Sequence, residues 1–95
     1  MEKLIVDPMV CVNHSGDDLA IDIYLTGASK DSIKLDMNKQ SFCVKAEGDN
    51  SIYNSCYSLA HDINPVKSKA SYKEGLLSIK APLVRRKDYV NVRIN

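Results

Sequence analysis

Apolar and polar residues alternate with a period of two along most of this chain, a pattern typical of β-strands that bury one face. The clearest run covers residues 18–25, where aliphatic side chains at every second position share one face. Further strands are predicted at 9–14, 32–37, 41–46, 52–60, 69–72 and 76–81. A helix beginning at Ser29 is the alternative for 32–37, but the spacing of Ile33, Leu35 and Met37 by two favours a strand.

The stretch from Lys69 to Pro82 is predicted to be a β-hairpin, around which the rest of the fold is arranged. Its turn is expected at Lys73-Glu74-Gly75, a three-residue loop in which Gly adopts the left-handed conformation. Pro82 has no N–H for a ladder and is expected to end the second strand. Short strands with turn signals between them, and no segment of helical period, predict an all-β, antiparallel, immunoglobulin-like β-sandwich.

The length, net charge and cysteine count argue against several classes of function. Ninety-five residues suit one domain. A net charge of +1 with interspersed signs gives no footprint for nucleic acid or an anionic membrane. No apolar run reaches the length of a membrane span, and residues 1–8 do not resemble a signal peptide. Because three cysteines are an odd number, we expect free thiols and a reducing, cytoplasmic location.

The residues offer no catalytic constellation and no glycine-rich phosphate loop, so we expect neither an enzyme nor a cofactor. The alternative is a zinc site built from two Cys–His pairs, Cys11 with His14 and Cys56 with His61. Cys11 and His14 are three residues apart on a strand, however, and therefore point to opposite faces. Ordinary thiols and surface histidines are the favoured interpretation.

Ala70, Gly75, Leu76 and Leu77 fit, in order and spacing, a motif that resembles the signature of the α-crystallin domain of small heat-shock proteins. The segment 62–69 resembles the family's lead into this alanine, and Tyr53, Tyr57 and Leu59 stand where family members carry aromatic residues and leucine. Residues 25–35 are similar to the family's Leu-Pro-Gly loop and following strand. The resemblance covers residues 8–82 and implies a sandwich of the α-crystallin type, with 1–7 as a lead-in and 83–95 as a tail.

Three features depart from the family pattern. Ser55 stands where the family typically has an arginine at the dimer interface, and the N-terminal arm is nearly absent. Only five residues separate Glu47 from Tyr53, so the strand exchange of many relatives is excluded by reach. The shortened outline is also similar to the CS domains of co-chaperones, although those typically carry tryptophan and this chain has none.

The resemblance implies an ATP-independent holdase that binds unfolding client proteins through strand edges and apolar grooves. The alternative is a CS-type module that recruits a specific partner without holdase activity. The family's partner groove would be formed here by Ile33, Leu35, Met37, Ala70 and Tyr72.

The tail offers Val90, Val92 and Ile94 as an aliphatic docking motif for the groove of a neighbouring copy. The alternative, to which the sequence gives equal weight, is that residues 89–94 form the last strand of their own domain. Self-association is expected as a dimer through the 52–60 edge, at Tyr53, Ser55 and Tyr57.

Overall fold

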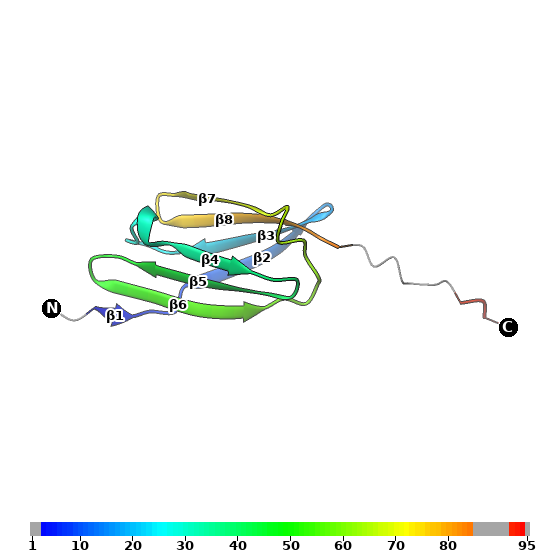
Figure 1. The fold of residues 1–95 in the computed structure, drawn as a ribbon, viewed down its shortest axis with the longest axis horizontal. Coiled ribbons are helices and arrows are strands. Elements are labelled where there is room, and N and C mark those ends of the chain that lie inside the picture. Colours follow the sequence, from blue (N-terminus) through cyan, green and yellow to red (C-terminus); the bar gives the residue numbers. More distant parts are fainter. Residues whose placement is uncertain (1–2, 85–91, 95) are drawn as a thin grey trace.

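The computed structural model describes residues 3–84 and 92–94 and shows a β-sandwich (Figure 1). Within the described residues its elements are β1 (Leu4–Ile5), β2 (Met9–Ser15), β3 (Asp18–Tyr24), η1 (Lys30–Ser32), β4 (Lys34–Met37), β5 (Ser41–Glu47), β6 (Ser51–Ser58), β7 (Lys69–Lys73) and β8 (Leu76–Pro82). One four-stranded sheet has the order β1-β6-β5-β4 and the other β2-β3-β8-β7. All pairs are antiparallel except β1 with β6. The predicted all-β sandwich is confirmed.

The core lies between the two sheets and is built by the predicted alternation. On β3, Leu19, Ile21 and Ile23 pair with Ala81, Ile79 and Leu77 of β8, and all six are buried. The facing sheet adds Phe42, Val44, Ala46 and Tyr53. Each fully buried large aliphatic or aromatic side chain favours folding by about 1.5–3 kcal/mol. The loop residue Ile63, which has no place in the alternating pattern, is also fully buried.

The turn of the central hairpin differs from the prediction. Lys73 pairs directly with Leu76, so the loop contains only Glu74 and Gly75. Both residues have positive φ, 51° for Glu74 and 83° for Gly75. Two left-handed residues make a type I′ turn, whose twist matches that of the flanking strands. The predicted three-residue turn was therefore wrong, because Glu74 takes a conformation usually left to Gly, Asn or Asp.

The other strand boundaries lie within two residues of those predicted. A single 3-10 turn, η1, precedes β4, so the strand expected at Ser32 begins at Lys34. β6 ends at Ser58 rather than Ala60. β8 includes Pro82, which pairs with Asp18, and the Leu83 N–H donates to the Asp17 carbonyl oxygen at 2.9 Å. Pro82 is nevertheless the last residue of β8, as predicted. No helix within 3–84 and 92–94 is long and apolar enough to cross a membrane.

The lead-in contributes a strand of its own. The Leu4 N–H donates to the Asn50 carbonyl oxygen at 3.0 Å and the Val6 N–H to that of Ile52 at 2.9 Å, which places β1 along β6. Val6 packs against the core, whereas the Leu4 and Ile5 side chains are 72% and 80% exposed. β1 therefore covers the β6 edge mainly through its backbone.

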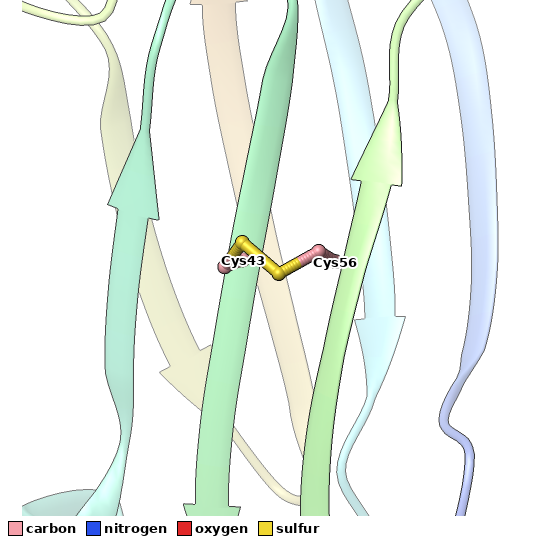
Figure 2. Close-up of a disulfide and its surroundings, with 2 residues drawn as sticks. All are labelled: Cys43 and Cys56. Carbon is pink, nitrogen blue, oxygen red and sulfur yellow. A yellow bond between two sulfur atoms is a disulfide. The ribbon is translucent and has the colours of Figure 1, made fainter.

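Two of the three cysteines form a disulfide. Cys43 on β5 and Cys56 on β6 are direct cross-strand partners with Cα atoms 4.0 Å apart, and their sulfur atoms are bonded (Figure 2). Cys11 is a free, exposed thiol. The expectation of free thiols throughout was wrong because an odd count still permits one bridge, and the register of β5 on β6 sets the two side chains opposite each other.

Candidate partner-binding edges

The predicted partner groove lies beside the free edge of β7. A hollow of about 360 Å³ is lined by Lys30, Ile33, Ala70, Ser71, Tyr72 and Leu77. The structure therefore brings together three of the five predicted groove residues: Ile33, Ala70 and Tyr72. Leu35 and Met37 lie farther along β4 and pack, half-buried, against the core. They do not line this hollow, so the groove is shorter than the two strand edges suggested.

Tyr72 fixes one wall of this groove. Its hydroxyl lies 2.8 Å from the carbonyl oxygen of Ala28 and 3.1 Å from that of Leu25, and it donates its one proton to either. The side chain thereby ties β7 to the loop that leads into η1. Ala70, two residues earlier on the same face, is small and exposed and leaves the groove open. The Tyr72 hydrogen bond thus joins the β7 side of the groove to the loop on its other side.

β7 also offers an unpaired backbone. Among the described residues it pairs only with β8, and its other edge is open. An extended segment laid along such an edge gains main-chain hydrogen bonds, and alternate side chains enter pockets beside it. Edge and groove together form a site for an added strand.

The dimer contact was predicted on β6, whose backbone beyond the end of β1 is open on one side among the described residues. Tyr53, Ser55 and Tyr57 point inward from this strand: Tyr53 is 6% exposed and its hydroxyl donates to the Thr26 carbonyl oxygen at 2.9 Å. Asn50 and Ile52 present their carbonyl oxygens to β1. By alternation, the backbone groups of residues 54, 56 and 58 face the same edge, beyond the end of β1.

The segment after β1 partly shields this edge. The Ser55 hydroxyl donates to Asp7 Oδ1 at 3.3 Å, and the Tyr57 hydroxyl donates to the Pro8 carbonyl oxygen at 3.3 Å. Ser55, which replaces the family's arginine, therefore bonds within its own chain. A second copy that pairs here would use the backbone of Asn54–Ser58, while the three predicted side chains stay inside. The dimer stays a prediction.

The tail motif is described only in part. Val92 and Ile94 are 75% and 95% exposed and form no strand, whereas Val90 lies outside the described residues. Both side chains are therefore available for contact. Docking of the tail on a neighbour stays a prediction.

The four residues of the alternative metal site do not come together. The rings of His14 and His61 meet edge to face with centroids 4.7 Å apart. Cys56 is bonded to Cys43. Cys11 pairs with Asp22 on β3, across the sheet from the face that carries His14. Within the described part of the chain, no three His, Cys, Asp or Glu side chains are grouped as metal ligands would be.

Known proteins resemble this chain both in sequence family and in structure. The family model of the CS domain matches residues 13–82. The chain belongs to the CS domain family. No curated protein matches this CS-domain chain in sequence. Its structure is similar to those of several small heat-shock proteins.

Heat shock protein 16.0 from Schizosaccharomyces pombe matches with a TM-score of 0.74 at 14% identity, over 95% of this chain and 76% of that one. HSP18.5 from E. histolytica matches with a TM-score of 0.75 at 22% identity, over 94% and 99%. A small heat-shock protein from Xylella fastidiosa, described as having a distinct high order structure, matches with a TM-score of 0.70 at 16% identity, over 93% and 95%. At these identities the likeness establishes the fold alone, which is of the predicted α-crystallin type, and the family model confirms the predicted likeness to CS domains.

Proposed function

We propose that this CS-domain protein is an ATP-independent holdase that binds unfolding polypeptides along the β7 edge. The observation that carries the proposal is the open edge of β7 beside a groove walled by Ile33, Ala70 and Tyr72. The fold shared with small heat-shock proteins supports it. We further propose that the protein acts in the cytoplasm, is not an enzyme and self-associates.

Binding would proceed by strand addition. An unfolding segment pairs its backbone with β7 and places an apolar side chain over Ala70 in the groove. Each buried aliphatic side chain contributes about 1.5–3 kcal/mol before ordering costs are subtracted. Because the client is captured from its unfolded state, binding competes with aggregation by mass action and needs no nucleotide.

A recruitment module is the second candidate function. The match of the CS family model to residues 13–82 favours it. The direct β5–β6 hairpin also favours it, because Glu47 pairs with Ile52 and leaves no exchange loop. Such a module would bind one folded partner and leave aggregating proteins unprotected.

Suppression of aggregation separates the two functions. The full chain is mixed at near-stoichiometric ratio with a heat-aggregating test protein, and light scattering is recorded. A holdase suppresses the scattering, and Ala70→Glu, which fills and charges the groove, removes most of the suppression. Ala60→Glu is the matched control, because Ala60 is exposed and does not line the groove. Full scattering with the unmodified protein contradicts the holdase and favours the recruitment module.

A further inference from the structure

The disulfide lies on the outer face of its sheet, at the strand next to an open edge. Phe42 and Val44 point into the core, so Cys43 points outward from β5, and Cys56 points outward from β6 (Figure 2). Cys43 is half-buried and Cys56 is exposed. The sulfur of Cys56 is therefore open to an attacking thiol from solvent.

The ladder surrounds the bridge with polar side chains. Asp36 of β4 stands opposite Cys43, Lys45 pairs with Asn54 on one side, and Ser41 pairs with Ser58 on the other. No large apolar side chain of these pairs shields the sulfurs. Exposed disulfides are the ones that are labile and regulatory, whereas structural disulfides resist reduction.

We propose that Cys43–Cys56 is a reversible redox site, reduced by a dithiol, whose opening loosens β6. The thiolate of the dithiol attacks Cys56 Sγ to form a mixed disulfide, and Cys43 leaves as a thiolate that takes up a proton. The second thiol of the reductant then attacks the mixed disulfide and releases Cys56 as a thiolate, which is protonated in turn. The reductant becomes a cyclic disulfide and the protein gains two thiols.

The bridge matters because β6 is held weakly on its other side. β1 contributes only two residues there, with exposed side chains, and beyond them the Val6 N–H and the hydroxyls of Ser55 and Tyr57 make single hydrogen bonds. The disulfide closes a short loop through the turn at 48–50, and cutting such a loop restores freedom to the open chain. β6 also carries Tyr57, whose ring stacks on Phe42 with centroids 5.2 Å apart. When β6 opens, these two rings become accessible beside the open edge. The inference concerns the fold and holds whether or not the chain is a holdase.

Hydrogen exchange followed by mass spectrometry tests the proposal on the full chain carrying Cys11→Ser, which prevents thiol exchange with the free cysteine. The oxidised protein is treated with dithiothreitol under native conditions, and thiols are counted by alkylation. We expect two new thiols and at least about tenfold faster exchange in residues 51–58. Exchange in β3 and β8, which form the core, stays within about twofold.

A variant with Cys43→Ser and Cys56→Ser is the control, and it should exchange like the reduced protein regardless of dithiothreitol. If this variant fails to fold, the comparison of oxidised with reduced Cys11→Ser protein still decides whether reduction loosens β6. A disulfide that resists dithiothreitol in the folded protein contradicts the proposal. Equal acceleration in all strands also contradicts it, because the bridge would then brace the whole domain rather than control β6.

Discussion

At the scale of single residues, Gly48 sets the shape of the loop that leads into the groove. It is buried, and a Cβ built on it would lie 2.3 Å from the carbonyl oxygen of Gly27 and 2.8 Å from its carbonyl carbon. Around this contact Ala28 bridges to Gly48, and Ser32 Oγ accepts the Glu47 N–H at 2.9 Å. The loop is thereby fixed on the end of β5, and its Ala28 carbonyl oxygen receives the Tyr72 hydroxyl.

We predict that Gly48→Ala destabilises the protein by about 1–3 kcal/mol, because the backbone of Gly27 must move to admit the methyl group. Thermal unfolding followed by circular dichroism measures the loss. Asp49→Ala, in the same turn but exposed, is the control and should change the stability by less than about 0.5 kcal/mol. Equal stability of Gly48→Ala and the unmodified protein would show that the two glycines are not in contact.

At the scale of elements, the β7–β8 hairpin carries a correctable strain. Glu74 occupies the first position of a type I′ turn with φ of 51°, and a non-glycine residue there is unfavourable. Asn tolerates this conformation. We predict that Glu74→Asn raises the stability by about 0.5–1 kcal/mol, measured by denaturant unfolding. Glu74→Gln, which removes the same charge but does not favour positive φ, should give no gain, and a gain of equal size there would assign the effect to charge.

The β6 strand has two edges with different partners, and proline distinguishes them. The Asn54 N–H faces the open edge, whereas the Ser55 N–H faces β5. We predict that Asn54→Pro stays folded and loses any self-association through this edge, while Ser55→Pro removes a ladder bond and unfolds at lower temperature. Sedimentation at several concentrations gives the mass. If the mass of Asn54→Pro equals that of the unmodified protein, another surface makes the assembly.

The sequence predicts these elements better than it predicts their register. Spacing by two identifies β3, β5 and β8 and nearly all of the buried side chains, because alternation follows directly from strand geometry. It cannot say that Cys43 lies opposite Cys56, since a turn placed at 47–50 implies a register displaced by two residues. It also misses Ile63, which lies in a loop, and the contact of Gly48 with Gly27, because neither has a local pattern.

The candidate site was predictable to a similar extent. The hairpin signature locates Ala70 and Tyr72, and the strand pattern locates Ile33. Leu35 and Met37 pack against the core and do not line the groove. This difference depends on how β4 lies against the other sheet. The coverage of β6 by β1 depends on a two-residue parallel pairing, which leaves no periodic signal in the sequence.

At the scale of the whole molecule, the two candidate edges belong to different sheets, β7 to one and the part of β6 beyond β1 to the other, while β2 and β4 are also edge strands among the described residues. A molecule with two such edges can pair with a second copy at one and receive an extended segment at the other. The tail is the segment of this chain suited to the β7 edge, because Val92 and Ile94 are two residues apart and exposed. In a strand, both would point toward the same groove.

We therefore predict that removing residues 88–95 lowers the mass of the assembly in solution without unfolding the domain, because the core found among the described residues is built from positions up to Leu83. Ala70→Glu, which alters the groove predicted to receive the tail, should lower the mass to the same extent. The two changes combined should add nothing, since each removes the same contact. Multi-angle light scattering measures the mass, and Ala60→Glu again serves as the control. A mass that stays unchanged on truncation shows that the tail does not link copies, and additive losses show that tail and groove act at separate contacts.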